Sequence, residues 1–66
     1  MRDDDVDIAF DEVLFITDKG GYKLLINDEE VWFPVQACPD LEDFEIGDGP
    51  GEFRCPERLA IEKGLA

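Results

Sequence analysis

The apolar residues of this chain come in short runs separated by turn-forming residues, and this pattern limits the possible folds more than any other feature. The longest runs are Val13–Ile16 and Val31–Val35, the second of which includes Pro34. A membrane-spanning helix needs about 20 consecutive apolar residues, and an amphipathic helix needs a sustained helical repeat. The pattern therefore favours several short strands.

Three consecutive runs predict an antiparallel meander, because each is rich in β-branched and aromatic residues. The predicted strands are Val13–Thr17, Tyr22–Ile26 and Val31–Phe33. The segments between them, Asp18–Gly21 and residues 27–30, contain the Gly, Asn and Asp residues that tight turns prefer. Pro34 is expected to end the third strand or to place it at an edge.

The flanking segments add two strands and a loop. Apolar and polar residues alternate over residues 6–11, which predicts a strand, and residues 52–55 predict a short final strand. Residues 36–50 have no clear period, so we expect a loop there with one helical turn near residues 41–44. Leu41, Phe44 and Ile46 are expected to hold this loop against the core.

The C-terminal end has the signals of a short helix of about eight residues. Pro56 suits the first helical position, and Glu57 and Lys63 suit the two ends of the helix dipole. Gly64 suits the left-handed position after a helix, with Leu65 folding back on the last turn as in a Schellman motif.

These elements predict an α+β fold: a small antiparallel meander of three to four strands, barrel-like, with a short C-terminal helix. A chain of 66 residues has room for a single domain, residues 1–66, of which residues 1–5 are expected to be frayed. Association into a homodimer would enlarge the small core, so both a monomer and a homodimer are compatible with the sequence.

The charge is strongly acidic, with 18 acidic and 6 basic side chains, no histidine and a formal charge of −12. Binding to nucleic acid requires Lys and Arg along the phosphates, and anionic membranes would repel the chain. We therefore expect neither partner and expect a basic one, such as the DNA-binding groove of another protein. The N-terminus has no pattern of a secretory signal, so we expect a cytoplasmic location.

The residue types argue against an enzyme. The chain has no histidine and no serine, its only aliphatic hydroxyl is that of Thr17, and Cys38 and Cys55 have no base partner. The two cysteines are expected to be free thiols, and they are too few for a zinc site. No cofactor is expected. A calcium site is an open alternative, because two acidic clusters supply hard oxygen ligands: residues 3–7, and Asp40, Glu42, Asp43 and Glu45. Asp3, Asp5 and Asp7 have the first spacing of an EF-hand loop, although Ile8 stands where Gly is required.

An acidic block without any base extends from residue 24 to residue 53 and supplies the candidate partner-binding residues. These are Asp28, Glu29, Glu30, Asp40, Glu42, Asp43, Glu45 and Asp48. One interpretation is a solvated face that keeps the protein soluble. However, a charge of −12 exceeds the magnitude of about 2–8 that suffices for a small domain, so a binding surface is the favoured interpretation.

Trp32 and Phe33 are neighbours on a predicted strand, so their side chains should point to opposite faces. One of them belongs to the core. The other lies either under the helix or on a binding surface.

The segment Val31–Gln36, the turn Gly47–Gly49 and the ending Cys55–Leu65 resemble small phage and prophage proteins with a W-I-P or W-L-P strand and a P-E-W-L-A-x-x-K-G-L ending. Arg58 stands where those proteins often have an aromatic residue. The resemblance implies a small module encoded by mobile elements, either β-barrel-like or a sheet plus a helix. In size and charge the chain is also similar to phage-encoded inhibitors of host defence, including anti-CRISPR proteins that mimic DNA.

The leading functional hypothesis is therefore an anti-CRISPR-type inhibitor that blocks duplex DNA binding by a host complex. The alternative is an accessory protein-binding module of phage replication or recombination machinery, anchored by Trp32 or Phe33.

Overall fold

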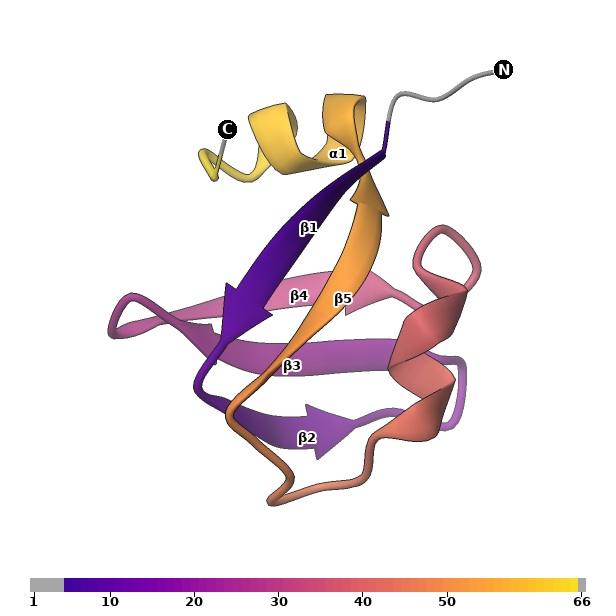
Figure 1. Cartoon of the computed structure of the whole chain (residues 1–66). Coiled ribbons are helices and arrows are strands. Elements are labelled where there is room, and N and C mark those ends of the chain that lie inside the picture. The colour runs from indigo at the N-terminus through magenta and orange to yellow at the C-terminus, as the bar shows by residue number, and fades with distance from the viewer. Residues whose placement is uncertain (1–4, 66) are drawn as a thin grey trace.

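The computed structural model describes residues 5–65 as five antiparallel strands in two sheets, with a short 3-10 helix and a short α-helix (Figure 1). The elements in chain order are β1 (Asp5–Phe10), β2 (Glu12–Ile16), β3 (Gly21–Ile26), β4 (Glu29–Pro34), the 3-10 helix η1 (Pro39–Asp43), β5 (Gly51–Pro56) and α1 (Glu57–Glu62). Neither helix in this part of the chain has the length and apolarity to cross a membrane. The predicted frayed segment lies outside the described residues except for Asp5, which begins β1.

The predicted meander is confirmed as the three-stranded sheet β2-β3-β4. The β3–β4 turn consists of Asn27 and Asp28, whose φ angles of 53° and 67° are those of a type I′ turn. At the other hairpin, Gly20 adopts a φ of 90° and its N–H donates to the carbonyl of Thr17 at 3.1 Å. The turn residues that separate the apolar runs therefore set the register of this sheet.

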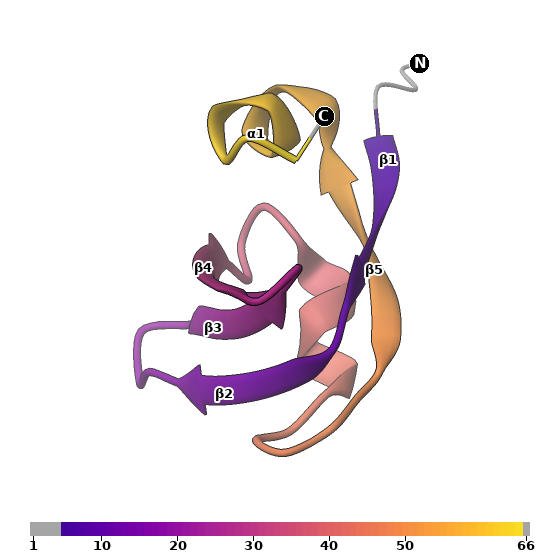
Figure 2. The ribbon, with the colours of Figure 1, turned by 90° about the vertical axis from the view of Figure 1, so that its left-hand side faces the viewer.

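The first and last strands, β1 and β5, pair with each other in a separate two-stranded sheet, which we call the ribbon. Its register runs from Asp5 opposite Pro56 to Phe10 opposite Gly51. Figure 2 shows the ribbon and the meander as two layers, with the chain turning from β1 into β2 at the corner. At this corner the N–H of Asp11 donates to the carbonyl of Leu25 at 2.7 Å.

The prediction of a barrel-like closure is therefore wrong, and the fold as a whole has five strands, of which three form the predicted meander. The short helix beside these strands is consistent with the α+β class. The free edge of β2 is not paired with a strand, because the loop before β5 occupies it. The N–H of Val13 donates to the carbonyl of Asp48 at 2.9 Å, and the N–H of Gly47 donates back to the carbonyl of Val13 at 2.8 Å. This loop satisfies the edge that a barrel would have used for closure.

Segment 36–50 forms η1 close to the predicted helical turn. Leu41 is fully buried and Phe44 is half-buried against the core, as expected. Ile46 is 58% exposed, so the prediction that it packs on the core is wrong. Ile46 lies in the turn between Glu45 and Asp48, which the N–H of Asp48 closes on the carbonyl of Glu45 at 2.9 Å, and it projects to solvent there.

The C-terminal helix α1 ends as predicted but begins one residue later and is six residues long. Pro56 is not the first helical residue: it ends β5 and pairs with Asp5, with extended ψ of 136°. Gly64 has a φ of 77°, its N–H donates to the carbonyl of Ile61, and that of Leu65 donates to the carbonyl of Ala60. These two bonds define a Schellman motif.

Four phenylalanine rings form a connected cluster in the core, and one of their contacts crosses between the two layers. The ring of Phe10 on β1 lies 5.0 Å from that of Phe44 and 6.0 Å from that of Phe53 on β5. The Phe53 ring in turn lies 5.0 Å from that of Phe33 on β4. Edge-to-face contacts of this kind stabilise a core beyond the area they bury.

Removal of a ring from this buried cluster should therefore lower the stability of the whole protein. We expect Phe53→Ala to lower the free energy of unfolding by about 3–5 kcal/mol, since Phe53 is buried. The matched control Phe15→Ala removes an exposed ring and should cost about 0.5 kcal/mol or less. Urea unfolding followed by the fluorescence of the single tryptophan measures both values. Equal losses in the two variants would contradict the described core.

Candidate functional site

The structure divides the eight predicted partner-binding residues among separate places, although all eight side chains are exposed. Asp28, Glu29 and Glu30 lie at the β3–β4 turn. Asp40, Glu42 and Asp43 belong to η1, and Glu45 and Asp48 lie in the turn that follows it. In Figure 1 the β3–β4 turn and η1 lie at opposite ends of the meander. The eight residues, whose convergence the sequence left open, therefore do not share one surface.

Two of these residues support the backbone. The Asp48 carboxylate accepts the N–H of Glu45 at 2.8 Å, which stabilises the turn along the edge of β2. The Asp40 carboxylate accepts the N–H of Arg54 at 3.2 Å and so caps an N–H of β5. This second bond fixes η1 beside the ribbon and places the η1 acids next to those of β1 and β5.

The ribbon adds acidic residues that the sequence analysis did not select. Asp5 and Asp7 on β1 and Glu52 on β5 are exposed, while the alternate residues of both strands point to the core. Arg54 lies opposite Asp7, with 3.9 Å between its Nε and the Asp7 carboxylate. The signal for these acids was the alternation of Asp with apolar residues in residues 5–8. Their convergence depends on the pairing of the first strand with the last.

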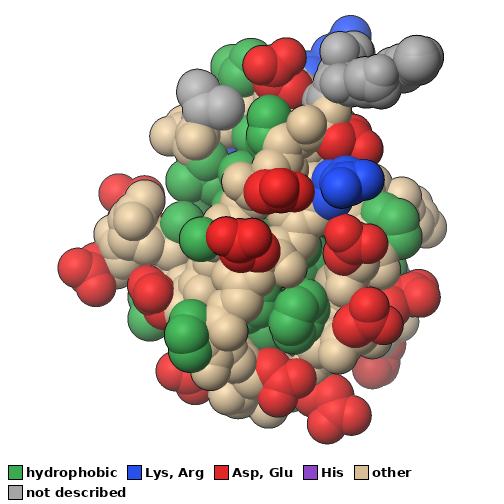
Figure 3. All heavy atoms as spheres, in the orientation of Figure 1, with side chains coloured by type: hydrophobic (Ala, Val, Ile, Leu, Met, Phe, Trp, Pro, Cys, Tyr) green, Lys and Arg blue, Asp and Glu red, His purple; other side chains and the backbone are tan. Residues whose placement is uncertain are grey.

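We call the combined surface of the ribbon and η1 the acidic ribbon face. It consists of Asp5, Asp7, Asp40, Glu42, Asp43 and Glu52, with Arg54 among them. Figure 3 shows acidic side chains across the side of the molecule that carries β1 and β5, with little basic surface between them.

Internal pairing neutralises little of this charge. Within residues 5–65 the ion pairs join Arg54 to Asp7 at 3.9 Å and Lys23 to Glu30 at 2.8 Å. Both are exposed at the surface, where such a pair contributes about 0–1 kcal/mol. The carboxylates of the acidic ribbon face therefore repel one another and remain available to a basic partner.

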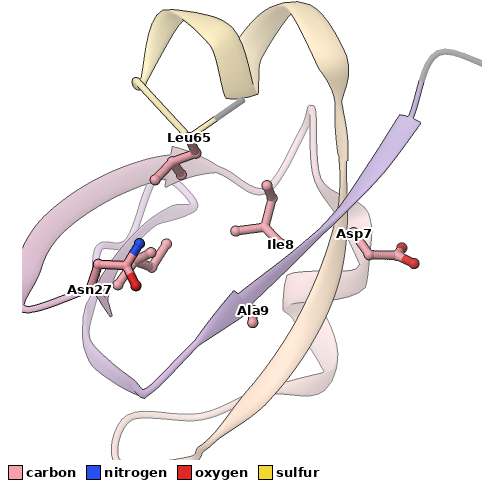
Figure 4. Close-up of a pocket in the computed structure, with 6 residues that line it drawn as sticks. Asp7, Ile8, Ala9, Asn27 and Leu65 are labelled. Atoms are coloured by element: carbon pink, nitrogen blue, oxygen red, sulfur yellow. The ribbon is translucent and has the colours of Figure 1, made fainter.

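One shallow hollow of about 190 Å³ lies beside the acidic ribbon face, between β1, the β3–β4 turn and Leu65 (Figure 4). Ile8, Ile26 and Leu65 give it apolar walls, and the carboxylate of Asp7 points away from it. Pockets for small molecules usually measure about 300–1,000 Å³ and contain convergent polar groups. This hollow is smaller and has no pair of titratable side chains directed into it.

Within residues 5–65, no three His, Cys, Asp or Glu side chains converge closely enough to hold a metal ion. The acids of η1, which formed part of the calcium alternative, are thus spread along the surface. The other candidate cluster includes Asp3, which lies outside the described residues.

The two cysteines lie together in the core as free, fully buried thiols. Each thiol is a hydrogen-bonding partner of the other, and the Cys55 thiol also donates to the carbonyl of Pro56 at 3.3 Å. Burial, together with the neighbouring Cys55 thiol, raises the pKa of Cys38 from 9.0 to about 12. Burial also raises the pKa of Cys55. The chain therefore keeps both thiols protonated and inert.

Comparison of the chain with protein-family models, with curated proteins and with the solved structures found no match.

We expect the Cys38 thiol to react very slowly with Ellman's reagent in the folded protein. With a pKa of about 12, its thiolate fraction at pH 8 is about a thousandfold lower than at a pKa of 9.0. Labelling the natural protein keeps the Cys55 thiol beside Cys38, and guanidinium should restore the normal rate of both thiols. Fast labelling without denaturant would contradict the described burial.

The raised pKa of Cys38 also predicts that the protein loses stability at alkaline pH. Below pH 9 the Cys38 thiol is protonated in both the folded and the unfolded chain. Above pH 9 only the unfolded chain loses the proton, because the folded pKa is about 12. The free energy of unfolding should therefore fall as the pH rises from about 9 toward 12. Cys38→Ala should reduce this slope, and an unchanged slope would argue against the shift.

Proposed function

We propose that this protein is a phage-type inhibitor that binds the basic DNA-binding groove of a host defence complex, with an anti-CRISPR role as the specific form. The acidic ribbon face is the observation that supports this proposal. Its carboxylates lie on two paired strands and on η1, which the Asp40 carboxylate bonds to β5. The phage origin rests on the resemblance of the Val31–Gln36 and Cys55–Leu65 segments described above.

The size and spacing of this face suit a surface that replaces DNA. The longest dimension of the protein is 32 Å, over which one strand of duplex DNA carries about nine phosphates. Alternate residues on a strand are about 7 Å apart, so Asp5 and Asp7 present charge at about half the density of one DNA strand, and the acids of β5 and η1 add to it. Carboxylates held on strands lose little freedom when they bind, which favours affinity.

The mechanism would be competition for the same Lys and Arg side chains. Carboxylates accept charge-assisted hydrogen bonds from these groups as phosphate oxygens do. The complex would then be unable to bind its duplex target while the inhibitor is present. The site of action would be the bacterial cytoplasm.

The alternative function, an accessory protein-binding module of phage replication or recombination machinery, is favoured by a different observation. Phe33 is buried, whereas Trp32 is 43% exposed on the other side of β4. Binding through such an anchor would depend little on salt, whereas binding through the acidic ribbon face would weaken steeply as the salt concentration rises.

A charge-reversal experiment tests the proposal. The triple variant Asp7→Lys, Glu42→Lys and Glu52→Lys changes the acidic ribbon face and leaves Asp40 and its backbone bond intact. We expect at least about a hundredfold loss of affinity for a purified RNA-guided DNA-binding complex, because close charge pairs across an interface contribute several kcal/mol together. Fluorescence anisotropy of a labelled duplex target measures the competition.

The matched control is Asp18→Lys, Glu29→Lys and Glu62→Lys, which has the same formal charge but changes exposed acids of the meander and of α1. We expect this control to compete almost as well as the natural protein. Equal losses in both triple variants would show a dependence on total charge rather than on this face, and full competition by the first variant would refute the proposal.

A further inference from the structure

Two large aromatic side chains lie on the outer face of the meander. Phe15 on β2 is opposite Lys23 on β3, and Lys23 is opposite Trp32 on β4, so all three project from the same face. Phe15 is 51% exposed and Trp32 is 43% exposed. The helix α1 packs on β1 and β5 instead, and η1 packs on β5.

The local backbone holds these rings in place. The β2–β3 register shifts between Val13 and Phe15, and this irregularity brings Phe15 into the row of Lys23. The Trp32 ring covers Gly21, since its Cε3 and Cζ3 atoms lie 3.6 Å from where a Cβ of that glycine would be. The Lys23 ammonium lies 5.9 Å from the centre of the Trp32 ring. The aromatic surface is therefore ordered before any partner binds.

Carboxylates adjoin this aromatic row. Glu12 on β2 and Glu30 on β4 are the cross-strand neighbours of Leu25 on β3. Leu25 is two residues after Lys23, so these carboxylates lie on the same face as the aromatic rings. Lys23 pairs with Glu30 at 2.8 Å, so the Lys23 charge is largely balanced. In the turn after β2 the exposed Asp18 is followed by the exposed Lys19, so this turn adds no net charge and Glu12 is the carboxylate that remains for a partner.

The charges and aromatic rings of the outer face indicate the chemistry of the partner that binds there. A second copy of the chain would bring two formal charges of −12 together, and nucleic acids and anionic membranes would be repelled as well. A cationic side chain is attracted both by the carboxylates and by the faces of the aromatic rings. Among cations, the planar guanidinium of arginine stacks best on such rings and bonds to carboxylates through two N–H groups.

We propose that the outer face of the meander binds an arginine-rich segment of a partner protein. Guanidinium groups stack on Trp32 and Phe15, and the Glu12 carboxylate accepts their hydrogen bonds. This surface lies on the other side of the core from the acidic ribbon face (Figure 2), so the inference does not rest on the function proposed above.

Trp32 is the only tryptophan of the chain, so its fluorescence reports directly on this surface. The probe is a synthetic dodecapeptide that repeats Arg-Leu-Gly, titrated at physiological salt to screen distant charges. We expect a saturable change in fluorescence. A peptide with Gln in place of Arg should bind at least about tenfold more weakly.

Phe15→Ser should weaken the binding of the arginine peptide at least about fivefold while the circular dichroism spectrum stays unchanged. The matched control is Ile61→Ser on α1, where the side chain is 56% exposed, and it should bind like the natural protein. The ribbon-face triple variant should also retain binding.

Three results would overturn the inference: no saturable change, equal binding of the Gln peptide, or equal affinity of the Phe15→Ser variant. If the variant Asp7→Lys, Glu42→Lys and Glu52→Lys is instead the one that loses affinity for the peptide, the arginine peptide does not bind the outer face of the meander. That result would overturn this inference and support the function proposed for the acidic ribbon face.

Discussion

The contact between the aromatic rings of the two sheets is the interaction on which the rest of this structure depends. The ribbon and the meander are separate hydrogen-bonded sheets, and the ring of Phe53 on the ribbon contacts the ring of Phe33 on the meander at 5.0 Å. Within the ribbon, the Phe10 ring supports Phe53 from 6.0 Å. The packing is tight at Gly51, where a Cβ would lie 3.0 Å from the Phe10 ring and 3.3 Å from the Phe44 ring, so that these rings would have to shift to admit it. A small core of this kind has little stability to spare.

The charge of the protein acts against that small core. Alternation along β1 and β5 turns Ile8 and Phe53 inward and therefore turns Asp7 and Glu52 outward. Carboxylates at neighbouring positions repel one another, and the few surface ion pairs offset only a small part of this repulsion. The fold needs polar residues at these positions, but it does not need so many of one sign. The proposed basic partner would remove this repulsion on binding.

Local signals in the sequence were sufficient for the meander and for the end of the helix. Asn27 and Asp28 specify a two-residue turn, and Gly64 with Leu65 specifies a Schellman motif, because each depends only on neighbouring residues. The pairing of β1 with β5 could not be predicted in this way, since strands far apart in sequence carry no local signal for their partner. The prediction of a barrel failed for the same reason, because it required knowing that residues 47–48 would occupy the edge of β2.

The candidate site was likewise predictable only in the part that depends on local sequence. Exposure of the eight predicted acids followed from composition, but their distribution in space followed from the topology, which separates the Asp28 turn from η1 and brings Asp7 and Glu52 beside Asp40. The alternative places considered for Trp32 were resolved by the register of β4, which turns Phe33 inward and Trp32 outward. The outward residues of the ribbon and of the meander lie on opposite sides of one core. Substitutions on one face therefore leave the contacts of the other unchanged, so one small chain has two surfaces of different chemistry that binding experiments can separate.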